Sequence, residues 1–274
     1  MDIHTTITLN NGVKIPQFGL GVFLCEDGEE AYNSVRWALE AGYRHIDTAK
    51  VYGNESSVGR AIKDSGIPRE DIFITTKLWN SDIRDGVQEK AFYDSLERLG
   101  CDYVDLYLIH WPVREGYNEA WKTMEALYEK KLIRAIGVSN FNPHHYETLM
   151  KDATVNPAIN QIELHPILTQ KDIVSYFREK DVAIESWSPL GRGELLGEPE
   201  IVKMAARLGK TPAQVIIRWH LQSGLIVIPK SVHKSRIIEN ASVFDFELTK
   251  EQMSNIDALN KNQRTGASPD NFTF

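Results

Sequence analysis

Cysteine is scarce in this sequence, whose 274 residues include only Cys25 and Cys101. Two cysteines cannot build a disulfide framework, and these two lack the spacing of a metal-binding or redox pair. The shortage argues against a small disulfide-stapled fold. It indicates a protein of a reducing compartment, for which we expect the cytoplasm.

Positive charge is also in short supply. The chain has 31 Lys and Arg against 38 Asp and Glu, which gives a formal net charge of −7. Affinity for nucleic acid comes mainly from cations that neutralise phosphates, so this balance argues against a nucleic-acid partner. Any anionic ligand must therefore meet a local basic cluster.

Long apolar runs are missing as well. The longest aliphatic run, residues 225–228, is far shorter than the ~20 residues that span a bilayer. The first residues also lack the charged-then-apolar pattern of an export signal. We expect no membrane partner, and nothing in the sequence points to an obligate protein partner.

Linkers rich in Gly, Ser or Pro are absent, and the chain instead shows a regular alternation. Short aliphatic or β-branched runs begin near residues 18, 45, 72, 104, 135, 158, 182 and 225, and segments of helical spacing lie between them. One such segment carries the stripe Ala31, Val35, Ala38 and Gly42, and the last interval holds two helical patterns, 198–208 and 211–223. Eight strand–helix units predict one α/β domain over residues 1–274, a (β/α)8 TIM barrel.

The rival architecture is a doubly wound open sheet. Such a sheet would carry a glycine-rich phosphate-binding turn after its first strand. Gly19 and Gly21 supply two of the three glycines, but Leu24 occupies the third position. The failed motif favours the barrel.

Residues 5–16, ahead of the first predicted barrel strand, have the pattern of a β-hairpin. Ile7 and Leu9 alternate before the turn residues 10–12, and Val13 and Ile15 alternate after it. We expect this hairpin to cap one end of the barrel.

Polar residues gather where the predicted strands end. The carboxyl ends of barrel strands converge on one face, which is where the chemistry of such barrels is found. In chain order the positions are Asp47, Lys77, His110, Ser139, Asn140, Gln161, Trp187, Ser188, Lys230 and Ser231. Strand ends are commonly polar, so the convergence of several candidates carries the argument rather than any one of them.

Three of these residues, with Tyr52, could polarise and protonate a carbonyl group. Asp47, Lys77 and His110 follow three consecutive strands, and Tyr52 lies in the loop after Asp47. We expect the Lys77 ammonium to lower the pKa of the Tyr52 phenol, Asp47 to keep Lys77 charged, and a neutral His110 to donate to the carbonyl oxygen.

Two other interpretations of these residues stay open. The first is a buried structural ion pair with a tyrosine packed on it. The second is a Schiff-base enzyme using Lys77, which would require a neutral lysine where an Asp47 partner favours a charged one.

A basic segment in this acidic chain predicts an anion site. Residues 229–236 contain Lys230, Lys234, Arg236 and His233 where the eighth strand turns into a helix. Cations at a helix amino terminus are unfavourable unless an anion is bound among them, and phosphate is the natural ligand. Because no side chain donates a hydride, carbonyl reduction would also require a cofactor. The alternative is a solvated basic loop.

Six motifs, in order and at barrel-compatible intervals, resemble the aldo-keto reductase superfamily. They are residues 47–55, LYLIHWP at 106–112, IGVSNF at 136–141, Asn160-Gln161, residues 188–191 and IPKS at 228–231. The likeness runs from about residue 5 to residue 260 and is greatest to small bacterial glyoxal, methylglyoxal and 2,5-diketogluconate reductases. The resemblance implies an NADPH-dependent reductase of small aldehydes, α-dicarbonyls or keto sugars. It also implies Tyr52 as proton donor, Lys77 and Asp47 tuning it, and His110 orienting the substrate.

The resemblance also implies a set of cofactor contacts. From the nicotinamide to the adenine end these are Ser139, Asn140 and Gln161 on the carboxamide, Trp187 stacked on the ring, Ser188, Leu190 and Gly191 at the pyrophosphate, Lys230, Ser231 and Arg236 at the 2′-phosphate, and Glu239 and Asn240 at the adenine. Many members of the family carry Tyr at the position of Trp187, and an indole would preserve the stacking.

Aromatic residues near these motifs are expected to line the substrate pocket. They are Phe23, Trp79 and Trp111, and only 14 residues follow Asn260, from which we expect a small, open pocket. A non-enzymatic NADPH-binding regulator would not need all four residues of the Tyr52 group. No metal is expected, since His144, His145, His165, His220 and His233 lack the spacing of one site.

Overall fold

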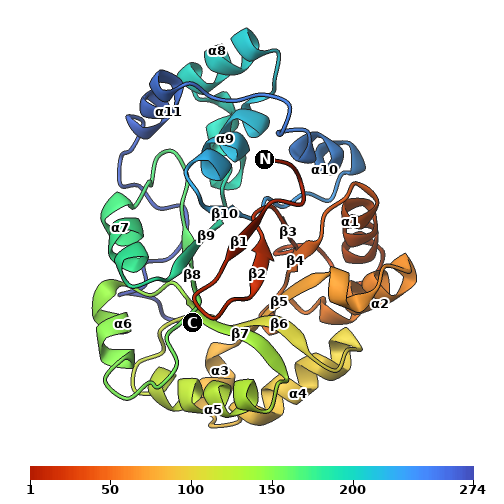
Figure 1. Cartoon of the computed structure of the whole chain (residues 1–274), viewed down its shortest axis with the longest axis vertical. Helices are drawn as coiled ribbons and strands as arrows, with labels where there is room; N and C mark the ends of the chain where they lie inside the picture. The colour runs from red at the N-terminus through yellow and green to blue at the C-terminus, as the bar shows by residue number, and fades with distance from the viewer.

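A computed structural model describes residues 1–274, and its centre is a ring of eight parallel strands (Figure 1). The strands pair in chain order: β3 (Leu20–Gly21), β4 (His45–Asp47), β5 (Phe73–Leu78), β6 (Val104–Ile109), β7 (Ile133–Ser139), β8 (Ile159–Glu163), β9 (Ala183–Trp187) and β10 (Ile226–Val227). The ring closes where Gly19 N donates to Val227 O and Val227 N donates to Gln17 O, both at 3.0 Å. The predicted (β/α)8 barrel is confirmed, with all eight strands at the predicted places.

The helices lie outside this ring (Figure 1). They are α1 (Glu29–Glu40), α2 (Glu55–Ser65), α3 (Asn80–Arg84), α4 (Gln88–Leu99), α5 (Tyr117–Glu129), α6 (Pro143–Leu149), α7 (Lys171–Glu179), α8 (Pro199–Leu208), α9 (Pro212–Gln222), α10 (Lys234–Ala241) and α11 (Lys250–Asp257), with 3₁₀ turns η1 (Lys50–Tyr52), η2 (Arg69–Asp71) and η3 (Gly191–Gly197). No helix is both long and apolar enough to cross a membrane.

Helix boundaries follow local chemistry. The two predicted patterns at 198–208 and 211–223 correspond to α8 and α9, and the Thr211 hydroxyl accepts from the amide of Gln214 to cap α9. The predicted helical stripe from Ala31 to Gly42 was wrong at its end. Helix α1 ends at Glu40, and Gly42 lies beyond it with a φ of 97°. A positive φ ends a helix, and periodicity alone does not reveal it.

The amino-terminal hairpin forms as predicted, from β1 (Thr6–Thr8) and β2 (Lys14–Pro16), with Ile7 opposite Ile15. Leu9 and Ile15 are buried in a cluster that includes Phe73, the first residue of β5. The hairpin therefore plugs the end of the barrel where the strands begin, and Figure 1 shows it lying across the ring. The opposite end is left for the site.

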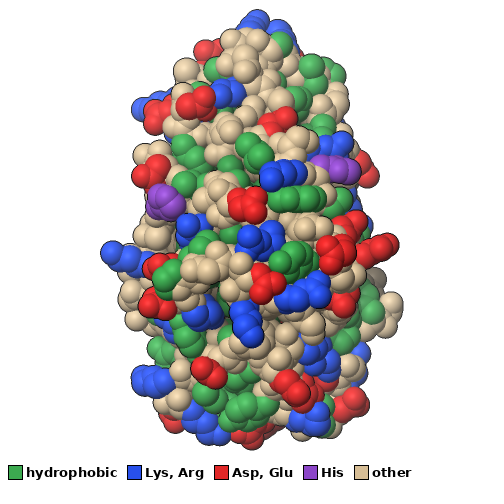
Figure 2. Space-filling view, turned by 90° about the vertical axis from the view of Figure 1, so that its right-hand side faces the viewer, with side chains coloured by type: hydrophobic (Ala, Val, Ile, Leu, Met, Phe, Trp, Pro, Cys, Tyr) green, Lys and Arg blue, Asp and Glu red, His purple; other side chains and the backbone are tan.

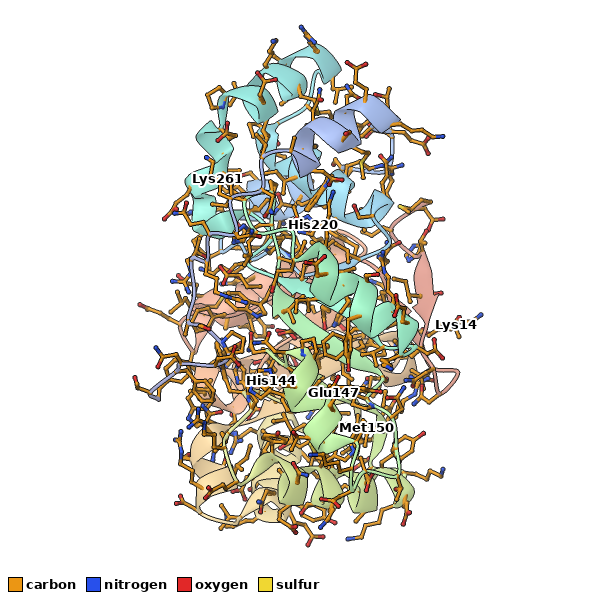
Figure 3. All side chains as sticks on the ribbon, turned by 90° about the vertical axis from the view of Figure 1, so that its left-hand side faces the viewer. Lys14, His144, Glu147, Met150, His220 and Lys261 are labelled. Atoms are coloured by element: carbon orange, nitrogen blue, oxygen red, sulfur yellow. The ribbon has the colours of Figure 1, made fainter.

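The side of the molecule drawn in Figure 2 carries acidic and basic side chains interspersed, without an extended field of one sign. In Figure 3 the hairpin residue Lys14 lies at one edge of the molecule, while His220 is buried inside it. The face drawn in Figure 2 therefore offers an anion no extended basic surface.

Gly59 allows α2 and α4 to cross closely. A Cβ atom there would lie 2.1 Å from the backbone oxygen of Leu99, and a backbone atom cannot rotate away. Although alanine favours a helix interior by up to about 1 kcal/mol, we expect Gly59→Ala to destabilise the protein by roughly 1–3 kcal/mol, because overpacking outweighs propensity. Urea unfolding measures the change. Gly197→Ala, where nothing lies within 4 Å, is the control, and equal stability of the two variants would contradict the prediction.

Candidate active site

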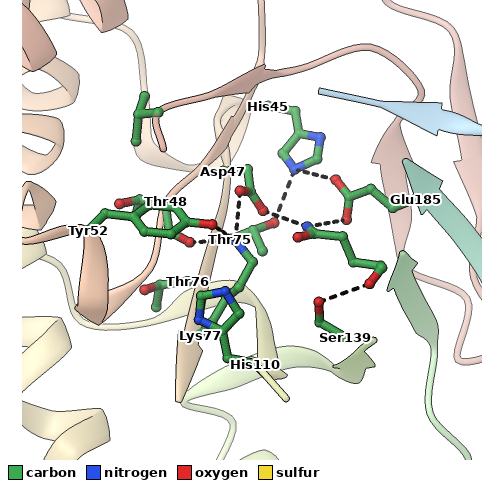
Figure 4. Close-up of polar contacts among 12 residues, drawn as sticks. His45, Asp47, Thr48, Tyr52, Thr75, Thr76, Lys77, His110, Ser139 and Glu185 are labelled. Atoms are coloured by element: carbon green, nitrogen blue, oxygen red, sulfur yellow. Dashed lines mark hydrogen bonds and ion pairs between the residues drawn. The ribbon is translucent and has the colours of Figure 1, made fainter. Parts of the chain in front are cut away.

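The fold brings the four residues of the Tyr52 group together at the open end of the barrel (Figure 4). Asp47 is the last residue of β4, Lys77 lies near the end of β5, and His110 directly follows β6. Tyr52 ends η1, in the loop that enters α2 at Glu55. Adjacent parallel strands thus place three side chains side by side, and the loop carries the phenol over them.

Lys77 is the centre of this group. Its Nζ donates to Asp47 Oδ1 at 2.7 Å and to the Thr48 carbonyl at 2.9 Å, and it lies 3.4 Å from Tyr52 Oη. Burial lowers the pKa of Lys77, but its acidic neighbours, Asp47 first among them, together raise it by more, so the net pKa lies above its ordinary value. A charged amine that already donates to three oxygens is not the free nucleophile of a Schiff-base enzyme.

The pKa of Tyr52 moves opposite to the expectation. Burial raises it to about 12, and this effect exceeds the lowering by Lys77. The sequence correctly indicated that the Lys77 ammonium lies near Tyr52, but it did not show how completely the fold buries the phenol. Tyr52 is consequently a phenol, not a phenolate, at neutral pH, which suits a proton donor.

His110 faces the same space. Its ring centroid lies 5.7 Å from that of Tyr52 and 5.1 Å from that of Trp79. Burial and then Lys77 hold the pKa of His110 well below its ordinary value, so the imidazole is neutral, as expected. Asn140 fixes its backbone, since Asn140 Nδ2 donates to the His110 carbonyl at 3.0 Å.

A second buried acid, Glu185 on β9, lies behind Asp47 and was missed by sequence reasoning. Gln161 Nε2 bridges the two, donating to Asp47 Oδ2 at 2.7 Å and to Glu185 Oε2 at 3.1 Å. His45 Nε2 lies 3.6 Å from Glu185 Oε1 (Figure 4). Because two carboxyl groups accept from its nitrogen, the amide of Gln161 has a fixed orientation. A glutamate in the middle of a predicted barrel strand was the available signal.

Glu185 should make stability depend on pH. Burial, followed by the Asp47 charge, raises its pKa from 4.5 to about 8. The folded protein therefore keeps a proton that the unfolded chain releases, so stability is lost as pH rises from about 4.5 to about 8. Glu185→Gln removes this loss, and we expect its stability advantage over wild type to grow across that window by an amount of order 3–5 kcal/mol.

Unfolding by urea at pH 5, 7 and 8.5 measures this difference. The exposed Glu200→Gln is the matched control, whose difference from wild type should not change with pH. Parallel curves for Glu185→Gln and wild type would show that Glu185 does not hold its proton.

One cavity of about 930 Å³ connects the Tyr52 group with the basic segment. Of the residues expected to bind substrate or cofactor, it is lined by Phe23, Trp79, His110, Trp111, Ser139, Asn140, Gln161, Trp187, Ser188, Leu190, Lys230, Ser231, Arg236, Glu239 and Asn240. Asp47 and Tyr52 also line it. Lys77 lies beneath them, and Gly191 packs on Leu195 instead of lining the cavity.

The end of the chain contributes to this cavity, which the sequence did not reveal. Phe274 stacks on Trp79 with ring centroids 5.9 Å apart, and its ring lies 5.1 Å from that of Trp111. Gly266, Ala267 and Phe274 all line the cavity. The short tail thus reaches the aromatic walls, where we had expected it to leave an open pocket.

The basic segment contains two kinds of cation. Lys234, at the start of α10, is 3.3 Å from Glu40 and does not line the cavity. Lys230 and Arg236 line the cavity, and neither has a carboxylate within 4 Å. Arg192, which the sequence reasoning did not select, lines the cavity as well. Unpaired cations on the wall of a cavity fit a phosphate.

Two neighbouring histidines lie outside this cavity. His144 (labelled in Figure 3) and His145, at the start of α6, approach Asp270 at 3.0 and 3.5 Å. The nitrogen and oxygen atoms that these three residues could offer to a metal lie within 4.8 Å of one another. However, His145 Nδ1 accepts from the Asn142 amide, so Nε2 carries the hydrogen and offers no lone pair to a metal.

The whole sequence agrees with this geometry. Residues 19–261 match the family model described as the aldo/keto reductase family. This chain belongs to that family. The reductase is 52% identical to the glyoxal reductase of Bacillus subtilis, with 99% of each chain covered, and 47% identical to the methylglyoxal reductase DkgA of Escherichia coli K12, with 98% of each covered. A variant of Gox0644 solved in complex with NADPH matches it with a TM-score of 0.94, 41% identity and 99% of each chain covered.

Proposed function

We propose that this reductase transfers a hydride from NADPH to the carbonyl of a small substrate, with Tyr52 as the proton donor. The observation that carries the proposal is one cavity lined both by the Tyr52 and His110 rings and by the unpaired Lys230 and Arg236. A dinucleotide with a 2′-phosphate has a reactive ring and an anionic group at its opposite ends, so the residues fit this cofactor. NADPH supplies the hydride when bound.

The protein residues would supply binding, orientation and a proton. Gln161 is held by Asp47 and Glu185 with its amide oxygen left to face the nicotinamide carboxamide, together with Ser139 and Asn140. Trp187 would stack on the nicotinamide ring. Ser188, Leu190 and Gly191 would serve the pyrophosphate, Lys230, Ser231 and Arg236 the 2′-phosphate, and Glu239 and Asn240 the adenine, whether by side chain or backbone.

At the reacting end the neutral His110 would donate a hydrogen bond to the substrate oxygen, while Tyr52 Oη delivers the proton to it. Lys77 keeps its own proton, because Asp47 stabilises the ammonium. Its role would be to stabilise the phenolate as Tyr52 loses the proton. Burial of the group strengthens that charge interaction.

Short α-dicarbonyls are the substrate class that we favour over other aldehydes and keto sugars. Phe23, Trp79, Trp111 and Phe274 form apolar walls around the two polar rings. Walls of this kind fit a small substrate with one oriented oxygen. Two close relatives are named glyoxal reductase and methylglyoxal reductase. We further propose that residues 1–274 act as one domain.

A carbonyl panel tests the proposal. Glyoxal, methylglyoxal, a simple aldehyde and a keto sugar are mixed with enzyme and either NADPH or NADH, and the loss of reduced nicotinamide absorbance is followed. We expect the highest kcat/KM for an α-dicarbonyl with NADPH. No consumption of either cofactor with any carbonyl would contradict the proposed function, and equal rates with all four would contradict the substrate class.

A further inference from the structure

The indole of Trp187 is held at both ends. At one end its Nε1 donates to Asn140 Oδ1 at 2.9 Å. At the other, the backbone of Gly266 lies so close that a Cβ atom there would be 2.4 Å from Cη2 and 3.1 Å from Cζ3 of the ring. The ring therefore cannot slide along its long axis in either direction.

The segment that makes the second contact, residues 264–267, is here called the strap. It is tied to Glu163, the fully buried last residue of β8. Glu163 Oε1 accepts from the Thr265 amide at 2.6 Å, from the Thr265 hydroxyl at 2.7 Å and from the Gly266 amide at 3.1 Å. Glu163 on β8 and Trp187 on β9 are paired in the sheet. The residue that binds the strap and the residue that carries the indole are therefore direct neighbours.

Glu163 remains charged in this position. Burial raises its pKa, but hydrogen bonds from His165 and Thr265 lower it by more, so the net pKa is below its ordinary value. Arg264 Nη1 lies 3.5 Å from the other carboxylate oxygen, Glu163 Oε2. Moving the strap away from Trp187 would leave a buried carboxylate without these donors, which is costly.

We propose that the strap positions Trp187 for the nicotinamide ring, and that position 266 must be glycine because any side chain there displaces the indole into the cofactor cavity. This inference rests on the proposed function, which places the nicotinamide against Trp187. Glu163 and Gly266 are then positioning residues, acting on the cofactor through the indole, while Asn140, a proposed contact of the carboxamide, also anchors the other end of the ring.

Gly266→Ala tests the inference with two ligands. NADPH needs the position of the indole, whereas adenosine 2′,5′-bisphosphate carries the 2′-phosphate and adenine but no nicotinamide. By calorimetric titration we expect Gly266→Ala to weaken NADPH about tenfold, as an overpacked site does, and to change the bisphosphate affinity less than about twofold. Gly197→Ala, a glycine with free space around it, should change neither affinity.

A double-mutant cycle identifies the ring as the cause. Phenylalanine at position 187 lacks the far atoms Cη2 and Cζ3 that a Cβ at position 266 would meet. In the Trp187→Phe background, Gly266→Ala should therefore change NADPH affinity by less than about twofold. An undiminished effect in that background would overturn the inference, because it would show that the loss does not pass through the indole.

Other outcomes are equally decisive. Equal weakening of both ligands by Gly266→Ala would indicate general damage, and unchanged affinity for both would show that the strap does not set the ring. Either result would overturn the inference while leaving wild-type reduction with NADPH intact. If wild type itself failed to bind NADPH, the proposed function would be at fault instead.

Discussion

Replacing Tyr52 by phenylalanine is expected to lower kcat for carbonyl reduction by about 10²–10⁴-fold, the range that general acid catalysis contributes. The variant loses one hydroxyl, which lies 3.4 Å from Lys77 Nζ and has no other hydrogen-bond partner. The phenyl ring keeps its packing against Phe23 and His110, at centroid distances of 5.0 and 5.7 Å. Chemistry should therefore fail without loss of fold.

The same substitution should leave NADPH affinity nearly unchanged, because it removes only the Tyr52 hydroxyl and leaves the unpaired Lys230 and Arg236 in place. Steady-state kinetics and NADPH titration are measured side by side. Tyr32→Phe is the matched control, since that hydroxyl bonds Asp64 outside the cavity and its loss should change neither quantity. Turnover of Tyr52→Phe close to wild type would remove Tyr52 from the role of proton donor.

Lys77→Met removes the charge that stabilises the conjugate base of Tyr52 but keeps the proposed proton donor itself. The Tyr52 hydroxyl is retained, but the ammonium that stabilises its conjugate base is lost, so reduction should also fail. Borohydride treatment of wild type with substrate should trap no covalent adduct, since Lys77 Nζ is fully buried and bonded to Asp47 and Thr48. A trapped adduct on Lys77 would favour the Schiff-base enzyme instead.

The barrel and the grouping of Asp47, Lys77 and His110 could be predicted because both depend on local pattern. Strand–helix alternation specifies a parallel ring, and parallel strands place their carboxyl ends on one face. Residues at consecutive strand ends must then be neighbours whatever the details of packing. The hairpin was equally accessible through its turn residues, and α9 through its helical spacing.

Glu185, Gly266 and Phe274 could not be found in the same way. Glu185 lies inside a strand, and only the closed ring shows that its side chain points inward beside Asp47. Gly266 and Phe274 belong to a tail without periodicity, whose path depends on contacts with Glu163 and Trp79 from distant parts of the chain. Long-range contacts of this kind leave no local pattern.

The pKa of Tyr52 shows a limit of another kind. Sequence neighbours identified the cation that lowers it, but burial is a property of the whole fold and has the larger effect. In its proposed role as proton donor, Tyr52 would begin the reduction at neutral pH with its proton in place.

Cofactor choice should depend on Arg236. The 2′-phosphate distinguishes NADPH from NADH and adds a charge of about −1.5 to −2. A hydrogen bond to a charged group contributes roughly 1.5–3 kcal/mol, and a guanidinium can hold a phosphate with two such bonds. Because Arg236 is exposed, solvent screening reduces this value, and we expect Arg236→Ala to weaken NADPH about 10- to 30-fold and NADH less than about twofold.

Lys234→Ala is the control that distinguishes direct contact with the 2′-phosphate from a general effect of positive charge. Lys234 lies two residues away on the same helix, so it contributes a similar long-range field, but its ammonium pairs with Glu40 and does not line the cavity. If contact with the 2′-phosphate decides the preference, Lys234→Ala retains it and Arg236→Ala loses most of it. If the general positive field decides the preference for NADPH over NADH, the two variants lose the same share of that preference. Raising the salt concentration should lower the preference for NADPH over NADH in wild type and in Lys234→Ala, because salt screens the contact between Arg236 and the 2′-phosphate. The preference of Arg236→Ala should change less, because this variant lacks that contact. Equal losses of NADH and NADPH in Arg236→Ala would show that Arg236 binds a part common to both cofactors.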